Sequence, residues 1–113
     1  MKFLPQRFAI ASFGNGGFRF GGHSHLGHLL VSPSGMRAWD GVDFSVLVAE
    51  CAEIDFVLMG TGATMMRPSK SILNLFSTQN MPFDFMNTSS AVHIYNQVLS
   101  EGRRVAAGFV AVE

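Results

Sequence analysis

Residues 87–112 decide the fold, and they read NTSSAVHIYNQVLSEGRRVAAGFVAV. Apolar side chains recur at helical spacing over residues 91–99, which predicts a helix with one buried face. Thr88 is expected to cap the start of this helix, and Gly102 is expected to end it. The run 105–112 is apolar at nearly every position, which is typical of a strand covered on both faces. This segment therefore predicts a helix that leads into a buried strand.

The middle of the chain repeats the same alternation of helix and strand. One helix is predicted over residues 43–51, with Asp43 as its cap, and another starts at Pro68. The short apolar runs at 56–59 and 83–86 are predicted strands. Strands that alternate with helices favour a mostly parallel sheet, because each right-handed crossover returns the chain in the same direction.

Residues 7–39 are predicted to be β-structure. Four short strands are expected, at Phe8–Phe13, Phe18–Phe20, Leu29–Val31 and Met36–Trp39. Turns rich in glycine, serine and proline separate them at 14–17 and at 32–35. This N-terminal portion is expected to add an antiparallel piece at an edge of the sheet or over one of its faces. The whole chain, 1–113, is therefore predicted to be a single α/β domain with a mixed, mostly parallel central sheet.

Composition excludes several classes of protein. The net charge is +0 and only 14% of residues are charged, so nucleic acid is not an expected partner. No stretch approaches the length of a membrane helix, and Pro5 interrupts the apolar start before a signal peptide could form. Cys51 is the single cysteine, which suits a reducing compartment. We therefore expect a soluble cytoplasmic protein without an integral membrane segment.

The apolar content points to a protein partner. Apolar residues make up 48% of the chain, including eleven Phe and seven Met, while charged residues are few. Some of this apolar surface is expected to be covered by a protein that the sequence does not identify. A homodimer through an edge strand or a Phe-rich face is a second form of the same expectation.

Gly60-Thr61-Gly62 follows a predicted buried strand, where open α/β sheets commonly bind ligands. Neither nucleotide-binding fingerprint is complete. Met65 stands where a dinucleotide motif needs its third glycine, and Thr64 and Ser69 stand where a phosphate-binding loop needs glycines. A tight turn is the simpler interpretation. If the Thr88 end of the later helix lies beside this loop, the two would form a small anion-tolerant pocket.

Asn96 and two arginines complete the candidate site. Arg103 and Arg104 follow the helix end, and strand alternation directs them to opposite faces. One is expected to pair with Glu101 or Asp84 and the other to serve a ligand or partner, but the sequence does not say which. The candidate ligand or partner site therefore contains Gly60, Thr61, Gly62, Thr88, Asn96, Arg103 and Arg104.

Other residues that could carry chemistry have simpler interpretations. His23, His25 and His28 have short spacings that zinc sites use, yet no carboxylate or thiol lies nearby to complete a site. We expect them to be solvated loop histidines. Cys51 lies on the apolar stripe of its helix and is expected to be an inert core thiol, since nothing in the spacing favours a pair with His93. No catalytic residue, cofactor or metal is therefore expected.

A set of short motifs resembles a small, uncharacterised α/β family. These motifs are Gly14–Phe20, Val31–Gly35 with Trp39, Gly60–Gly62, and the closing run with Thr88, Ala91, Tyr95-Asn96, Leu99, Glu101–Arg104 and Val105–Ala107. The mitochondrial members of that family include assembly factor 3 of NADH:ubiquinone oxidoreductase (complex I), and other members are adipogenesis-associated proteins. The resemblance covers nearly the whole chain.

The resemblance implies a three-layer fold with a mixed central sheet and no established enzymatic activity. It also implies action through protein partners during complex I assembly. Many relatives carry Arg and Thr where this chain has His93 and Ile94, which weakens an anion-binding role there. Two functions stay open. The favoured one is a non-catalytic interaction or assembly module linked to respiratory-complex biogenesis, and the other is a small-molecule or anion-binding domain, or an enzyme, that uses the Gly60–Gly62 edge.

Overall fold

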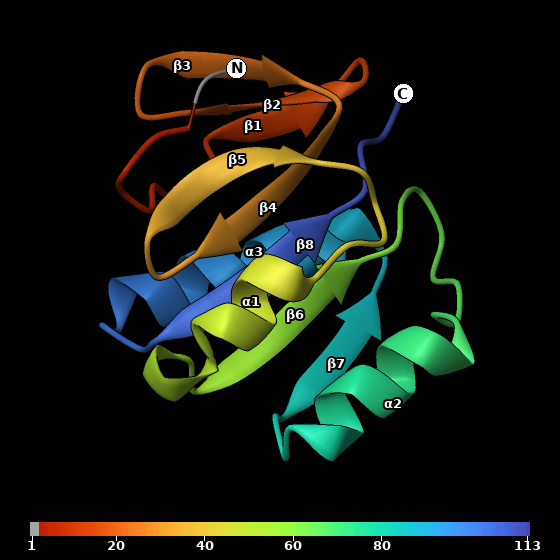
Figure 1. Cartoon of the computed structure of the whole chain (residues 1–113). Coiled ribbons are helices and arrows are strands. Elements are labelled where there is room, and N and C mark those ends of the chain that lie inside the picture. Colours follow the sequence, from red (N-terminus) through yellow and green to blue (C-terminus); the bar gives the residue numbers. More distant parts are fainter. Residues whose placement is uncertain (1–2) are drawn as a thin grey trace.

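The computed structural model describes residues 3–113, which form a five-stranded sheet and a separate three-stranded sheet (Figure 1). The strands of the larger sheet lie in the order β5 (Gly35–Trp39), β4 (His28–Ser32), β8 (Val105–Phe109), β6 (Phe56–Gly60) and β7 (Phe83–Met86). β8 is the central strand, and all five of its residues are buried. The prediction of a strand covered on both faces is confirmed for residues 105–109, whereas residues 110–112 lie beyond the strand and are only half-buried.

The larger sheet is mixed, as predicted, but it is not mostly parallel. The β5–β4 and β4–β8 pairings are antiparallel, and the β8–β6 and β6–β7 pairings are parallel. The difference arises because the β4–β5 hairpin joins the central sheet and pairs directly with β8. Sequence patterns describe single strands and do not reveal which strand lies next to which.

The smaller sheet is an antiparallel meander. Its strands are β1 (Ser12–Gly14), β2 (Gly17–Phe20) and β3 (His23–Leu26). The β1–β2 turn carries Asn15 at φ 52° and Gly16 at φ 79°, a two-residue hairpin geometry that suits the twist of the strands. The predicted turn at 14–17 is confirmed. The strand predicted at 8–13 begins only at Ser12, because the preceding backbone is held by a helix.

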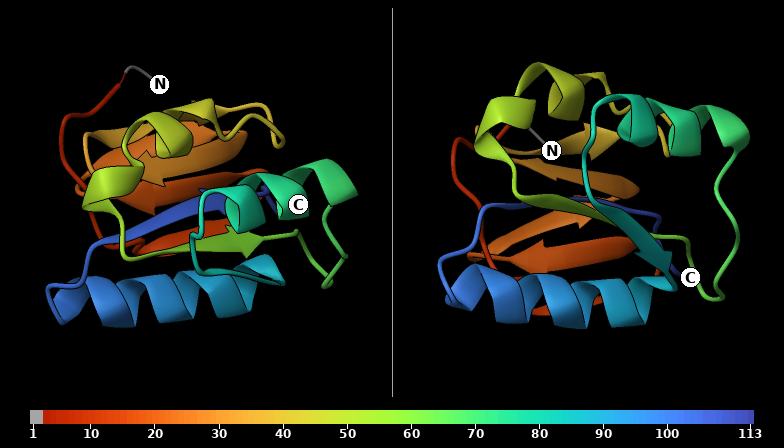
Figure 2. Two further views of the ribbon diagram at one scale, coloured as in Figure 1. Left: turned by 60° about the horizontal axis from the view of Figure 1, so that its bottom comes forward. Right: turned by 90° about the horizontal axis from the view of Figure 1, so that it is seen from below.

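Helices lie on both faces of the larger sheet (Figure 2). The three helices are α1 (Ser45–Ala49), α2 (Lys70–Thr78) and α3 (Thr88–Ser100), and a 3₁₀ turn at Cys51–Glu53 follows α1. α1 and α2 lie on one face, whereas α3 and the smaller sheet lie on the other (Figure 2). Within residues 3–113, no helix combines the length and apolar content needed to cross a membrane.

The ends of α3 differ slightly from the prediction. Asn87, not Thr88, is the cap, because Asn87 Oδ1 accepts the Ser90 N–H at 2.8 Å. Thr88 is the first residue of the helix and is completely buried. Gly102 ends the helix at φ 76°, and its N–H donates to Leu99 O at 3.0 Å, as expected for a C-terminal glycine.

The bounds of the two earlier helices differ from the prediction. α1 ends at Ala49, so Cys51 lies in the 3₁₀ turn and is only half-buried. Asp43 is not the cap of α1 as predicted, because the cap residue is Phe44, although Asp43 Oδ1 accepts the Ser45 N–H at 2.9 Å. α2 begins after Pro68, and the Ser69 side chain caps it.

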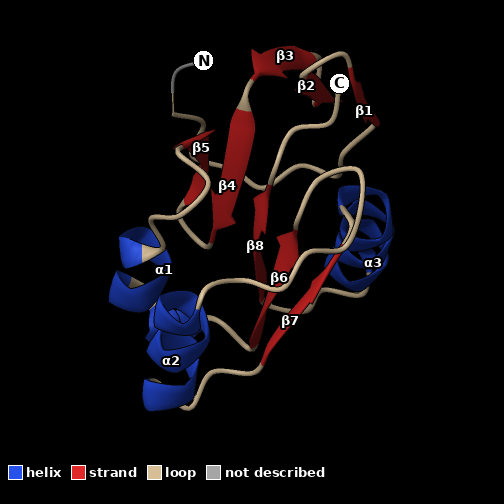
Figure 3. Ribbon diagram, turned by 90° about the vertical axis from the view of Figure 1, so that its right-hand side faces the viewer, coloured by secondary structure: helices blue, strands red, loops and turns tan. Residues whose placement is uncertain are grey.

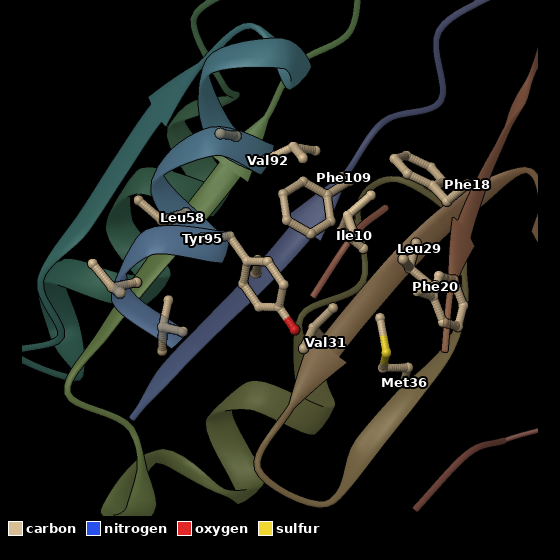
Figure 4. Packing of buried hydrophobic residues seen from close by; sticks show 14 residues of the cluster. Ile10, Phe18, Phe20, Leu29, Val31, Met36, Leu58, Val92, Tyr95 and Phe109 are labelled. Carbon is tan, nitrogen blue, oxygen red and sulfur yellow. The ribbon is translucent and has the colours of Figure 1, made fainter. Parts of the chain in front are cut away.

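One part of the core lies between the larger sheet, α3 and the smaller sheet (Figure 4). Tyr95 is fully buried there and packs edge-to-face on Phe109 with ring centroids 5.4 Å apart. Its hydroxyl donates to Phe8 O at 2.7 Å. Burial raises the pKa of Tyr95, so the hydroxyl keeps its proton and remains a donor.

The other part of the core lies under α1 and α2 and is rich in aromatic rings. Trp39 and Phe44 pack together with ring centroids 5.0 Å apart, directly over Gly108 of β8. A Cβ atom at Gly108 would lie 2.7 Å from a Trp39 ring carbon and 3.0 Å from one of Phe44. Glycine is therefore required here so that the two rings can contact the central strand.

Asn96 holds the segment that precedes β1. Its Oδ1 accepts the Ile10 N–H at 2.7 Å, and its Nδ2 donates to Ile10 O at 2.9 Å. The side-chain amide thus satisfies both backbone groups of one residue, as a neighbouring strand would. This contact explains why the predicted strand starts late.

We predict that Asn96→Ala lowers the free energy of unfolding by about 1–3 kcal/mol, because it leaves two backbone groups of Ile10 without a partner. Gln97→Ala is the matched control, since Gln97 is exposed on the same helix, and it should change stability by less than about 0.5 kcal/mol. Urea unfolding measures both values. Equal stability of the two variants would show that the Asn96 contact contributes nothing.

Candidate functional site

Six of the seven residues predicted as one site lie at opposite ends of α3. Gly60–Gly62 and Thr88 meet at its start, whereas Arg103 and Arg104 follow its end. The 13 residues of the helix span about 20 Å at 1.5 Å per residue. Asn96 lies between the two groups and bonds to the N-terminal segment. The structure therefore brings the residues together as two separate groups and not as one pocket.

The glycine loop and the start of α3 do touch, as the sequence suggested. The Gly62 N–H donates to Thr88 Oγ1 at 2.9 Å, and Thr88 Oγ1 donates to Val110 O at 2.7 Å. The Thr88 N–H donates to Gly62 O at 2.8 Å. A Cβ atom at Gly60 would lie 2.9 Å from Thr88 Cα, so the backbones are in close contact. These groups satisfy one another, and their amides are not directed at a ligand.

Thr61 folds the loop that follows β6. Its Oγ1 lies 2.8 Å from Thr64 O and 3.1 Å from Met86 O, to which it can donate, and it accepts the Met66 N–H at 3.0 Å. Met65 and Met66 at the tip of the loop are exposed. The hydroxyl of Thr61 therefore acts within the loop.

The arginine that is paired inside the chain is Arg104. Its Nη2 lies 2.9 Å from Asp55 Oδ1, and its backbone N–H donates to Asp55 Oδ2 at 3.2 Å. The Arg104 guanidinium lowers the pKa of the Asp55 carboxyl, and Asp55 in turn raises the pKa of Arg104. The predicted partners, Glu101 or Asp84, were wrong. Asp55 precedes β6, and the parallel register of β6 with β8 brings it beside Arg104.

Arg103 is the arginine that remains available. Its guanidinium carbon lies 4.7 Å from the centroid of the Phe56 ring, a cation–π geometry. Within residues 3–113, no carboxylate forms an ion pair with it. The stacking on Phe56 holds the guanidinium at the surface without neutralising its charge.

Arg103 and Phe56 form one end of a groove between α3 and β7, which we name the α3–β7 groove. It has a volume of about 470 Å³. Its walls include Phe56, Leu58, Asp84, Ile94, Val98 and Arg103. Sequence reasoning missed it because Ile94 and Val98 have the spacing of a core face, yet α3 packs mainly over β6 and β8. Ile94 is consequently only half-buried.

The histidines do not form a metal site. His25 is buried on β3 with its Nε2 2.8 Å from His28 O, and His28 Nδ1 accepts the Ala111 N–H at 2.9 Å. The prediction of solvated loop histidines was therefore wrong for His25 and for the half-buried His28, whereas His23 is exposed. In the part of the chain that the structure describes, no group of three or more His, Cys, Asp or Glu residues could hold a metal ion.

A second groove lies on the other side of α3. It has a volume of about 430 Å³, and Ile10, Phe13, Ser89, His93 and Asn96 are among its lining residues. Both polar atoms of the Asn96 side chain are already hydrogen-bonded to the backbone of Ile10. The α3–β7 groove is the stronger candidate because it combines apolar walls, a stacked arginine and a strand at the edge of the sheet.

Comparisons with known proteins agree on a family and on a fold. A family described as a protein of unknown function (DUF498/DUF598) matches residues 10–110. An uncharacterized protein of Rhodobacter capsulatus is 34% identical over 102 residues, which cover 89% of this chain and 82% of that protein. The crystal structure of a protein described as an outer membrane protein from Bartonella henselae has a TM-score of 0.90 at 37% identity, covering 96% of this chain and 98% of that one.

A more distant structure shows the same fold. A Bordetella pertussis protein described as a Mth938-like domain has a TM-score of 0.72 at 19% identity, covering 97% of this chain and 92% of that one. None of these descriptions mentions complex I, so that part of the resemblance stays a prediction. The match over residues 10–110 and the relatives above 30% identity establish that this chain belongs to the DUF498/DUF598 family of proteins of unknown function.

Proposed function

We propose that this protein is a non-catalytic interaction or assembly-type module and that the α3–β7 groove is its main contact surface. The observation that carries this proposal is the stacking of an unpaired Arg103 on Phe56 at one end of an apolar groove. Arginine and aromatic side chains are enriched among the residues that contribute most to protein–protein binding. An edge strand beside them adds backbone groups that a partner can use.

The size of the groove suits an anchor of a larger interface. A volume of about 470 Å³ accommodates a few side chains of a partner. A stable protein complex usually buries about 800 Å² on each partner, so contacts must extend beyond the groove. Arg103 and Asp84 at its rim supply charges of both signs, which would set the orientation of the partner.

The alternative, a small-molecule or anion-binding domain or an enzyme at the Gly60–Gly62 edge, has less support. An anion at the start of α3 needs free backbone amides. The Gly62 N–H is bonded to Thr88 Oγ1, and the Thr88 N–H is bonded to Gly62 O. These two amides are therefore already paired within the chain, which favours a structural role for these residues.

Two finer parts of the proposal rest on the family resemblance and composition alone, namely a role in respiratory-complex biogenesis and a cytoplasmic location. The description of the Bartonella henselae relative as an outer membrane protein supplies a different location. Fractionation of the native cell with immunodetection distinguishes the two. We expect the protein in the cytosolic fraction, and recovery in the outer-membrane fraction would contradict the cytoplasmic location.

We predict that Ile94→Glu removes the partners that the wild-type protein captures in a pull-down from the native cell. Ile94 lies in the wall of the groove, so a carboxylate there would have to be desolvated on binding. Gln97→Glu is the matched control, because it places the same side chain on the exposed face of α3. Thermal melts of both variants check that each is folded. A wild-type protein recovered alone, or an Ile94→Glu variant that keeps all its partners, would overturn the proposal.

We predict that Thr88→Val lowers the free energy of unfolding by about 1–3 kcal/mol, because Gly62 N–H and Val110 O lose their partner. Thr88→Ser keeps the hydroxyl and is the matched control.

In a thermal-shift screen with nucleotides, inorganic phosphate and metal ions, the wild-type protein should show no change in Tm. A rise in Tm with phosphate that disappears in Thr88→Val would favour the anion-binding alternative.

A further inference from the structure

We infer that the α3–β7 groove receives an extended segment of a partner protein, which adds as a further strand to the free edge of β7. This inference rests on the proposed function and specifies how the partner binds. β7 is the last strand on its side of the larger sheet (Figure 3). Its outer edge is open between α2 on one side and α3 on the other (Figure 2). Addition of a strand to an open edge is a recurrent way to bind an extended peptide.

The backbone of β7 offers groups for such a strand. The carbonyl oxygens of Pro82 and Met86 accept hydrogen bonds from β6 at 2.9 and 2.8 Å. Backbone groups of successive residues in a strand point to opposite sides, so those of Phe83 and Phe85 point away from β6. Among residues 3–113, β7 pairs with no strand other than β6, so the N–H and C=O of Phe83 and the C=O of Phe85 have no strand partner on the outer side. These groups are free for a segment that lies alongside.

The groove selects the side chains of that segment. Alternate side chains of an added strand would face α3 and enter the groove beside Ile94 and Val98, which favours apolar residues at every second position. Arg103 lies near the start of β7, beside Phe56. An acidic side chain or a terminal carboxylate near one end of the segment would therefore meet the unpaired guanidinium.

A second copy of this chain fits the edge poorly. Asp84 Oδ1 accepts the outward-pointing Phe85 N–H at 2.9 Å, which places the Asp84 carboxylate at the free edge of β7. Two copies of β7 paired antiparallel through Phe83 and Phe85 would place Asp84 opposite Asp84, and like charges in directly opposed positions are destabilising. A carboxylate on an edge strand is a common protection against self-pairing. The charge of Asp84 thus disfavours a second copy and favours a different protein as the occupant.

The test is a selection of random linear peptides of about eight residues, displayed on phage, against the full chain. We expect enriched peptides with apolar residues at alternate positions and an acidic residue near one end. A synthetic peptide of the enriched sequence should shift the amide resonances of Phe83, Phe85 and Ile94 and slow hydrogen exchange at Phe83. Absence of enriched peptides, helical spacing of their apolar residues, or shifts confined to another surface would overturn the inference.

Two adjacent arginines supply the matched variants. Arg103→Ala should weaken binding of the selected peptide about tenfold, because it removes the charge that faces the acidic residue. Arg104→Ala should leave the affinity within about twofold, since Arg104 pairs with Asp55. Equal effects of the two would contradict the assigned role of Arg103. If peptides fail but Ile94→Glu still loses its native partners, strand addition is wrong while the proposed function stands.

Discussion

Burial of β8 on both faces is the constraint on which the rest of the structure depends. The strand lies between an antiparallel and a parallel neighbour, and its side chains must fit under helices on one face and under α3 and the smaller sheet on the other. Its side chains are small at three successive positions, namely Ala106, Ala107 and Gly108. The glycine lets Trp39 and Phe44 rest on the strand, so a larger residue there would displace the aromatic core. The position of α1 thus depends on the absence of one side chain.

A buried central strand also imposes a demand on the chain that surrounds it. The backbone that leaves β8 and the backbone that leads into β1 both lie against α3, where their polar groups need partners. Thr88 bonds to Val110 after β8, and Asn96 and Tyr95 bond to Ile10 and Phe8 before β1. The polar side chains that make residues 87–104 resemble a functional motif are therefore largely the ones that hold the two ends of the chain in place.

Local patterns in the sequence predicted local structure, but they did not predict contacts between residues that are distant in the sequence. The turn at 14–17 and the helix ended by Gly102 follow from conformational preferences of a few neighbouring residues, and both are confirmed. The pairing of Arg104 with Asp55 joins residues 49 positions apart, and it follows from strand order, which periodicity does not encode. His25 was misjudged for the same reason, because a strand pairing buries it. The candidate site was likewise predicted residue by residue, whereas its division between the two ends of α3 is a property of the fold.

The two edges of the larger sheet differ in how far other parts of the chain cover them, and this difference affects how a partner could bind. At one edge, Leu4 pairs with Met36 of β5 through two backbone hydrogen bonds of 2.9 Å, so the N-terminal segment covers part of that edge. At the other edge, no segment of the described residues 3–113 covers β7, and the Asp84 carboxylate lies beside its outward backbone groups. If a segment of the same chain paired with β7, it would cover this edge and would also fill the α3–β7 groove. A short strand with one charge instead discourages self-association while leaving the backbone accessible. In the proposed interaction, the open edge and the apolar groove act as one surface, in which the backbone would supply affinity and Arg103 and Asp84 would restrict the choice of partner.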